Sequence, residues 1–414
     1  MVTLSIKGGD LLTVGDAVLA ERLQTGGPGQ VSLSPERVYE LGNYLGTGIL
    51  YDIPDLSFSM ESLDASCAME AMLLGTTQGA LTAHQKLTLS QNIPFDIITE
   101  FKRGVNDANS FDVYGSAVLP FLTTESVSYK FGLKDKAAQT VTLKGDTIYY
   151  PPGSAFRQHA TGTNTANQTV VLTHKVYQNN DDVINGVRYA LGVKLSSGKR
   201  LTLGTDYTEA AVIVGSGPTY TVTVTILAAV PSTDGIDIVY ASDTVANYPQ
   251  NSHTVPSTTK PAAIRGRDIQ VFVGGTTLGN RWTSVQSVQA DWKVTLDRDY
   301  EFGNTQLVAQ DFFVPEVSGN IVVKPRNYAD LFAKLKTIDG LSTLTEVAGA
   351  LKTNPVQVLF VLHSPVDGSV LKTIEIPDAI LTLPGFAGQV QQKLQFTIPF
   401  DSQAGVLNVY NQGM

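Results

Sequence analysis

Cysteine and histidine are scarce in this chain. Cys67 is the single cysteine among 414 residues, which excludes an internal disulfide and a cysteine-based zinc site and predicts a buried thiol. Of the five histidines, none lies within four positions of another. The sequence therefore has no local histidine pair of the kind that ligates metals.

Charge and long apolar runs are also limited. Charged residues make up 16% of the chain and hydrophobic residues 43%, a balance typical of a globular protein and not of a disordered one. There are 29 basic and 38 acidic residues, so the net charge of −9 argues against a basic stripe that binds nucleic acid. Uninterrupted apolar runs, such as 358–362, are too short to cross a bilayer. Residues 1–20 mix charges with short apolar stretches, so we expect a soluble protein with no secretion signal.

Three local fingerprints of enzymes are missing. The chain has no GxSxG elbow, no GxxxxGK[ST] loop and no GxGxxG after a strand. We therefore expect a protein that is not an enzyme, with no catalytic, cofactor-binding or metal site and no cofactor. A glycosidase that uses two carboxylates stays open as an alternative, because two acids can meet from anywhere in a fold.

An internal repeat is the most informative feature of the sequence. Residues 37–60 align without a gap with residues 298–321, at an offset of 261. The identical positions are Arg37, Tyr39, Glu40, Gly42, Asn43, Pro54 and Ser57 in the first segment and Arg298, Tyr300, Glu301, Gly303, Asn304, Pro315 and Ser318 in the second. These segments are predicted to support the fold or a subunit contact. The glycines would allow a backbone geometry that a Cβ would hinder, and the glutamates would accept a charged or backbone partner.

The similarity continues beyond the repeated segment. A short amphipathic helix is expected after each copy, from Asp64 to Gly75 and from Asn327 to Gly340. Later alternation predicts a strand at 127–133 and another at 394–400. We predict a mainly β chain with two tandem related β-sandwich or barrel domains, each with a short helix, at 1–152 and 262–414.

The segment between the copies matches neither of them. Alternation at 220–226 and the run 236–240 predict strands, and Ser197-Gly198 and Asp234-Gly235 predict turns. Residues 153–261 are therefore expected to form a small β-sandwich module. The module would end in a linker rich in Pro, Ser and Thr at 246–261.

Acidic residues cluster in the first copy. Between 39 and 85 there are six acids and no base: Glu40, Asp52, Asp55, Glu61, Asp64 and Glu70. One interpretation is a solvated surface with Asp64 capping the helix. The other is that Asp52, Asp55, Glu61 and Glu70 face a channel for DNA, where like charge keeps the polyanion from sticking.

The repeated segment resembles a family. The run Tyr-Glu-Leu-Gly-Asn at 39–43, followed by residues 52–62 and a helix, is similar to the tail tube proteins of tailed bacteriophages, and both copies carry the pattern. The first copy departs where Gly26-Gly27-Pro28-Gly29 replaces the apolar stretch 282–292. The resemblance implies tail-tube domains, a middle module of immunoglobulin-like type, and six domains per ring around a lumen.

With two such domains per chain, the expected ring is a homotrimer with pseudo-sixfold symmetry. Stacked rings would form the tail tube, the conduit for genome delivery. The implied partners are other copies of the chain, the tape measure, baseplate and terminator proteins, and phage DNA that passes without specific binding. The expected location is the virion tail, assembled in the host cytoplasm.

Two other functions stay open. A distal tail or baseplate hub protein can use paired domains of the same kind in trimers, and it would occur in one or two rings per virion. A glycan-binding β-sandwich adhesin is suggested by the threonine-rich middle module.

Overall fold

The computed structural model describes much of the chain. It describes residues 2–9, 16–18, 23–32, 35–38, 48–51, 55–63, 65–74, 81–89, 95–104, 111–151, 153–178, 188–213, 219–242, 264–274, 281–299, 309–325, 355–382, 385–387 and 394–414. At 2–55, 68, 72, 95, 99–115, 309 and 385–387 it describes the backbone alone. As predicted, the fold is mainly β and is built on large antiparallel sheets.

The N-terminal part contributes ten strands and the described helix. The strands are β1 (Val2–Gly9), β2 (Asp16–Val18), β3 (Leu23–Ser32), β4 (Pro35–Val38), β5 (Gly48–Tyr51), β6 (Asp55–Ser62), β7 (Lys86–Thr88), β8 (Phe95–Gly104), β9 (Phe111–Gly132) and β10 (Ala138–Gly145). The order of pairing is β3–β6–β10–β9–β8–β1, with β2 beside β1.

The C-terminal part contributes eleven strands. They are β18 (Ile269–Val273), β19 (Arg281–Trp282), β20 (Val285–Lys293), β21 (Leu296–Asp299), β22 (Ala309–Phe312), β23 (Glu316–Val323), β24 (Val356–His363), β25 (Val370–Leu381), β26 (Gly385–Ala387), β27 (Gln395–Ser402) and β28 (Asn408–Asn411). The order of pairing is β20–β23–β27–β25–β24–β18, with β19 beside β18. The two parts therefore follow one strand order.

The strand boundaries of the two parts also coincide. β21, β22 and β23 begin and end 261 positions after β4, β5 and β6. The hairpin register agrees as well, because Pro35 opposes Tyr51 and Leu296 opposes Phe312. The β8–β9 ladder shifts register at 95/97 and 101/102, and the β24–β25 ladder shifts at 356/358 and 362/363, again 261 positions later.

One continuous sheet runs through both parts. Four strands from each part join into this sheet where β9 pairs with β20. The strand order of the sheet is β26–β27–β23–β20–β9–β10–β6–β3. The first half of β9 turns into a second layer with β8 and β1, and β25 does the same with β24 and β18. A single hydrophobic cluster fills the space between the layers and contains Phe58, Leu143, Trp292 and Phe400.

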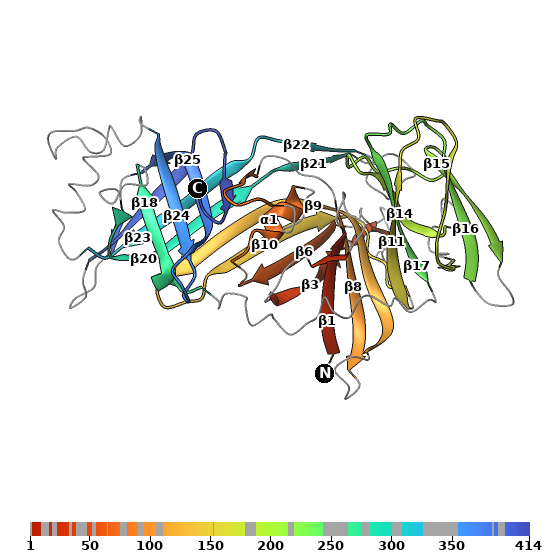
Figure 1. Ribbon diagram of the computed structural model, residues 1–414. Coiled ribbons are helices and arrows are strands. Elements are labelled where there is room, and N and C mark those ends of the chain that lie inside the picture. The colour runs from red at the N-terminus through yellow and green to blue at the C-terminus, as the bar shows by residue number, and fades with distance from the viewer. Residues whose placement is uncertain are drawn as a thin grey trace.

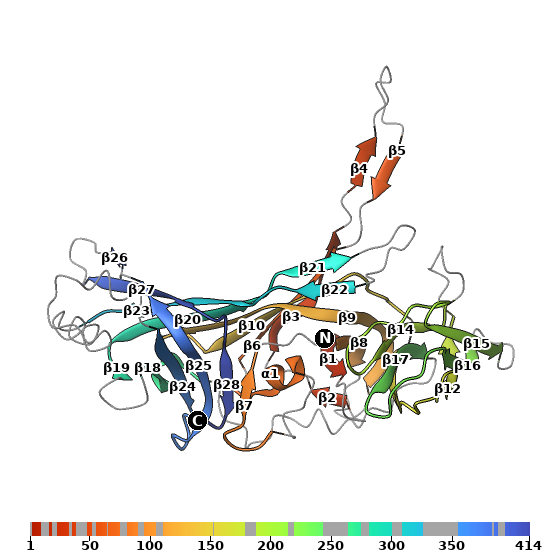
Figure 2. The same ribbon diagram turned by 90° about the horizontal axis from the view of Figure 1, so that it is seen from above.

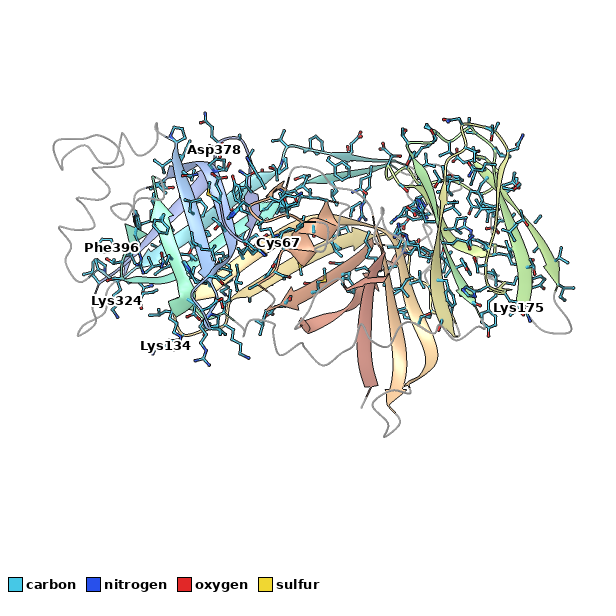
Figure 3. The ribbon with its side chains drawn as sticks, viewed as in Figure 1. Cys67, Lys134, Lys175, Lys324, Asp378 and Phe396 are labelled. Carbon is cyan, nitrogen blue, oxygen red and sulfur yellow. The ribbon has the colours of Figure 1, made fainter. Side chains whose placement is uncertain are left out.

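Helix α1 (Ala68–Leu73) is shorter than the sequence predicts. Met69, Ala71 and Leu73 are buried, so the helix packs against the sheet instead of lying in solvent. Asp64 and the helix expected at 327–340 lie outside the described residues. Cys67 is buried beside α1, as predicted (Figure 3).

The middle part forms a separate seven-stranded sheet. Its strands are β11 (Ser154–Thr161), β12 (Gln168–Val171), β13 (Val176–Tyr177), β14 (Ala190–Leu195), β15 (Tyr207–Ile213), β16 (Thr219–Ile226) and β17 (Gly235–Ser242). It has its own core, which includes Tyr207, Val224 and Tyr240. Figure 1 shows these strands at one end of the molecule and β18, β24 and β25 at the other. The predicted linker at 246–261 lies outside the described residues.

The two corresponding hairpins, β4–β5 and β21–β22, lie differently relative to this body. Figure 2 shows β4 and β5 projecting away from the sheets, with β21 and β22 lying along the body near the base of the projection. Two-stranded hairpins are marginally stable alone in water. Among the described residues, β4 and β5 pair only with each other.

Candidate assembly interface

The joint between the N- and C-terminal parts is a strand-to-strand contact. β9 and β20 pair antiparallel from Ser126 opposite Lys293 to Gly132 opposite Ser287. The ladder continues at both ends, because Val294 N donates to Glu125 O at 2.9 Å and Leu133 N donates to Gln286 O at 2.7 Å. The two parts are therefore held together by main-chain hydrogen bonds as well as by their common core.

Polar side chains reinforce this joint on the side away from the core. Across the joint Ser128 Oγ donates to Asp291 Oδ1, and within β20 itself Gln289 Nε2 donates to Asp291 Oδ2 at 2.7 Å. Gln310 Nε2 in β22 donates to Thr123 Oγ1 at 3.0 Å. Hydrogen bonds to a charged carboxylate are among the stronger ones, so the Ser128–Asp291 bond adds a side-chain link to the main-chain ladder between β9 and β20.

A buried charged cluster crosses the same joint on the core side. Lys372 Nζ in β25 pairs with Glu70 Oε1 in α1, and the two side chains are 1% and 0% exposed. Tyr129 OH and Gln139 Nε2 donate to the same glutamate oxygen at 2.7 and 2.8 Å. Burial, together with the adjacent Glu70, raises the pKa of Tyr129 well above its ordinary value, so the phenol stays protonated and donates.

Helix α1 and the strand after it also contact the C-terminal end of the chain. Lys372 Nζ donates to Ser66 O at 3.0 Å, and Cys67 Sγ lies 3.8 Å from Tyr410 O. β7 pairs with β28, with Leu87 opposite Val409. The first helix is therefore a bridge between the two parts, which excludes Glu70 from an exposed acidic face.

One face of the eight-stranded sheet is left uncovered by the second layer. Residues that alternate with the core positions point to it, and most of their side chains are polar or charged, with Val322 and Pro399 among the apolar exceptions. The charged ones are Glu61, Asp291, Glu316 and Asp401, with Lys130, Lys144 and Lys293. Among the described residues this face is mixed in charge, with Ser57, Ser59, Ser126, Ser128, Thr140 and Thr142 between the charges.

The middle sheet docks on the N-terminal part through buried charges. Lys194 Nζ in β14 lies 2.7 Å from Asp96 Oδ2 in β8, and both side chains are at most 3% exposed. Arg200 Nη1 lies 2.6 Å from Asp146 Oδ2, and its guanidinium carbon lies 4.3 Å from the centre of the Phe121 ring.

Apolar side chains surround these charges. Leu191, Val239 and Ala241 of the middle sheet pack with Ile98 and Val118. β17 is consequently buried along its whole length, with one face in its own core and the other against β8 and β9. Between 153 and 242, the described residues form a firmly attached module.

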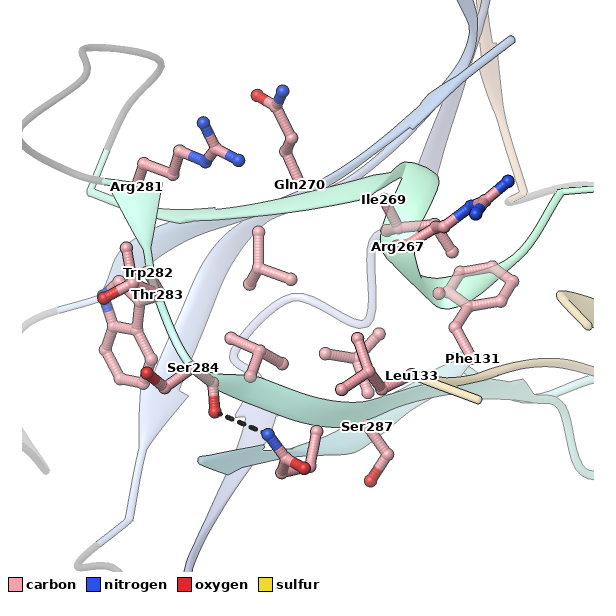
Figure 4. Close-up of a pocket in the computed structure, with 15 residues that line it drawn as sticks. Phe131, Leu133, Arg267, Ile269, Gln270, Arg281, Trp282, Thr283, Ser284 and Ser287 are labelled. Atoms are coloured by element: carbon pink, nitrogen blue, oxygen red, sulfur yellow. Dashed lines mark hydrogen bonds between the residues drawn. The ribbon is translucent and has the colours of Figure 1, made fainter. Parts of the chain in front are cut away.

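A shallow pocket of about 220 Å³ lies between β18, β19 and β20 (Figure 4). Trp282 and Phe131 contribute apolar walls, and Arg267 and Arg281 lie at its rim. Gln286 Nε2 donates to Ser284 O at 3.2 Å within it. Among the described residues no group of three or more His, Cys, Asp or Glu could hold a metal ion, and no helix is long and apolar enough to span a membrane.

The residues predicted from the repeat fall in several places. Arg37 lies in β4, Arg298 in β21, and Pro315 directly before β23. Arg298 Nη1 donates to Gly145 O at 3.3 Å, which ties β21 to the end of β10. Asp55 begins β6, and Glu61 lies on the uncovered face near the other end of that strand. Outside the described residues lie Tyr39, Glu40, Gly42, Asn43, Asp52, Pro54, Tyr300, Glu301, Gly303 and Asn304.

Glu70 requires a correction. The sequence placed it with Asp52, Asp55 and Glu61 as a candidate for an acidic face, but its side chain is fully buried against Lys372. The error has a physical cause, because the partner that compensates the charge lies in a distant strand and leaves no local pattern. Sequence reasoning also missed Lys372, Lys194 and Asp96, although each lysine occupies a buried position of a strand.

Comparison with known proteins assigns no family to this geometry. No protein-family model matches the chain, and no curated protein sequence matches it. The function must therefore be argued from strand pairing, burial and charge.

Proposed function

We propose that the chain is a structural subunit of a bacteriophage tail tube, in which three chains close into a ring and the rings stack into a conduit for DNA. The observation that carries the proposal is the eight-stranded sheet that ends in β3 on one side and β26 on the other. It consists of two four-stranded units of the same order, joined edge to edge by β9 and β20. The two four-stranded units already pair edge to edge once within the chain. The corresponding outer edges can therefore pair in the same way between neighbouring chains.

The two units are proposed to be copies of one ancestral domain. Their strand boundaries and register shifts recur at a common offset, which agrees with the offset of the sequence repeat. A pair of core residues supports this view. Phe58 opposes Leu143 in the first unit, and Gly319 opposes Phe400 at the corresponding positions of the second. A large side chain has moved from one strand to its neighbour while the pair still fills the core.

The uncovered face of the sheet suits the lining of a conduit for DNA. Its described charges are four carboxylates and three lysines, separated by serine and threonine. Such a surface offers no continuous basic stripe for phosphates, so DNA would pass without being held. In a closed ring, the second layer with β8 and β24 would lie outside this face.

The remaining elements have places in the same assembly. The middle module, which we propose to be an immunoglobulin-like decoration, docks on β8 and β9, away from the uncovered face. The β4–β5 hairpin projects beyond the sheets and is suited to contact a neighbouring ring (Figure 2). Tape measure, baseplate and terminator proteins are the proposed partners at the ends of the tube.

Native mass measurement of the purified chain, combined with negative-stain microscopy, tests the proposal. We expect a closed species of three chains and, at higher concentration, hollow tubes. A closed species of six whole chains, or monomers alone at high concentration, would contradict it. Copy number in assembled particles separates the alternatives, because many rings indicate a tube protein and one or two indicate a hub.

A further inference from the structure

Two strand edges at opposite ends of the eight-stranded sheet have no partner among the described residues. β3 pairs with β6 on one side only, and β26 and the end of β25 pair with β27 on one side only. In Figure 2 the labels of β26 and β3 are well separated, with β27, β23, β20 and β10 between them. Unpaired strand edges are templates for pairing with another chain, and proteins normally cover or block them.

The internal joint shows what a partner for these edges would look like. β27 occupies the place in the C-terminal part that β10 occupies in the N-terminal part. Both strands have eight residues and the same register, because Asp401 of β27 opposes Ser318 of β23, and Lys144 of β10 opposes Ser57 of β6. The neighbours of these strands therefore correspond too. Thr382 N donates to Pro399 O, so Thr382 is the position in the C-terminal part that corresponds to Ser126. By the offset of the sequence repeat, Ser32 is the position in the N-terminal part that corresponds to Lys293.

We propose that β3 of one chain pairs antiparallel with the β25–β26 edge of a second copy, with Ser32 opposite Thr382. This seam repeats the β9–β20 joint, in which Lys293 lies opposite Ser126. The inference rests on the proposed ring and adds which edges close it and in which register. Gly385–Ala387 of β26 then runs alongside the earlier residues of β3.

A second copy is the occupant that fits these edges. The chain's own two edges are separated by six strands of the same sheet and lie well apart in the structure, so they do not pair with each other (Figure 2). The second copy also continues an interface that the chain already contains, with the same strand order on each side. Three chains joined in this way contribute eight strands each to one closed sheet.

A disulfide across the seam gives a direct test. In the internal joint, Glu125 pairs with Val294 by a main-chain hydrogen bond, so the next pair, Ser126 with Lys293, is a non-hydrogen-bonded pair. Such pairs bring Cα atoms to about 4.5 Å, within the range for a disulfide. The variant S32C/T382C should therefore cross-link between chains on mild oxidation, and non-reducing electrophoresis should show dimers and trimers that reducing agent removes.

Three controls keep the result interpretable. S126C/K293C places the same bond in the internal joint and should close it within one chain, with no gain in mass. S32C/A387C puts the cysteines out of register by several residues and should not cross-link. The single variant S32C shows whether a cysteine at position 32 cross-links to the native Cys67. No such cross-link is expected, because Cys67 is buried.

The outcomes separate this seam from the ring itself. Three-chain rings of S32C/T382C that stay uncross-linked, while S126C/K293C closes, would overturn the seam and leave the ring. Cross-linked ladders that extend past three chains would support the seam and contradict the three-chain ring. Cross-linking of S32C/A387C equal to that of S32C/T382C would overturn the register, and failure of the parent chain to assemble would overturn both proposals.

Discussion

Lys372 and Glu70 form an ion pair that is closed to solvent and joins the C-terminal part of the chain to the helix of the N-terminal part. Tyr129 and Gln139 satisfy the same glutamate oxygen, and Gln139 also accepts from Lys372 Nζ at 3.2 Å. The first helix thus lies over the contact between the N- and C-terminal parts of the chain. Disruption of the pair is expected to loosen the joint from which we infer the ring.

Replacement of Lys372 by methionine should strongly destabilise the protein. It would leave the Glu70 carboxylate buried without its cation, and loss of one partner of a buried pair costs about 3–5 kcal/mol. The double variant E70Q/K372M should recover part of that loss, because no buried charge remains. Urea unfolding followed by fluorescence measures both, with K130M as the control at an exposed lysine of β9. A K372M variant as stable as K130M would show that the pair does not hold the joint.

Glu375 predicts a dependence of stability on pH. Burial raises the pKa of this carboxyl, but donation by Tyr410, Gln357 and Asn408 outweighs burial and leaves the pKa below its ordinary value. A lowered folded-state pKa contributes stability above the unfolded pKa of about 4.5, and this contribution is lost as the pH falls through the folded value.

The comparison of wild type with E375Q tests this dependence. The wild type should be more stable at pH 7, by roughly 1–3 kcal/mol for hydrogen bonds to a charged group. The difference should shrink as the pH falls below about 4.5. E316Q, at an exposed position of β23, serves as the control and should track the wild type. A difference between wild type and E375Q that stays constant from pH 7 to pH 3 would contradict the assigned ionisation.

Docking of the middle module should depend on Lys194. Burial lowers the pKa of this lysine, while the carboxylate of Asp96 raises it, so the pair balances desolvation against attraction. K194A should release the module and increase protease cleavage between 153 and 242, with a loss of about 3–5 kcal/mol for a broken buried pair. K199A is the matched control, because Lys199 is 67% exposed and lies 3.8 Å from Asp206. Equal cleavage of the two variants would mean that the Lys194–Asp96 pair is not needed for docking and that apolar packing and the Arg200–Asp146 pair attach the module.

Local patterns predicted the strands better than the contacts between them. Alternation placed strands at 127–133, 220–226 and 394–400, and the run 236–240 was predicted as a further strand. The structure has β9, β16, β27 and β17 there. The helix after the first repeat was predicted too long, since its hydrogen-bonded part begins at Ala68. The β9–β20 joint left no signal, because a strand edge has the same alternation whether it is paired or free.

A signal for the buried charges was present but ambiguous. Lys372 lies in phase with Ile374 and Ile376, so a charged residue occupies the buried side of an apolar strand. Such a lysine must find a partner or lose its charge. The sequence does not say where the partner lies, and Glu70 could be identified only once α1 and β25 were seen together.

The exchange of large side chains between the units gives the last prediction. Gly319 faces Phe400, and a Cβ at Gly319 would clash with the Phe400 ring and with the main-chain oxygen of Gln289. G319A should therefore destabilise the protein by about 1–3 kcal/mol through overpacking. F400L alone should destabilise it by creating a cavity.

The first unit shows that the opposite arrangement also packs, because Phe58 faces Leu143 with both side chains fully buried. The double variant G319F/F400L brings that arrangement into the second unit. Because the two positions are in contact, their effects should not add, and the double variant should be more stable than the sum of G319F and F400L by at least about 1 kcal/mol. A double-mutant cycle in urea measures this coupling. A coupling near zero would indicate that the backbones of the two units differ too much for their cores to be exchanged, which would weaken the case for a common ancestral domain.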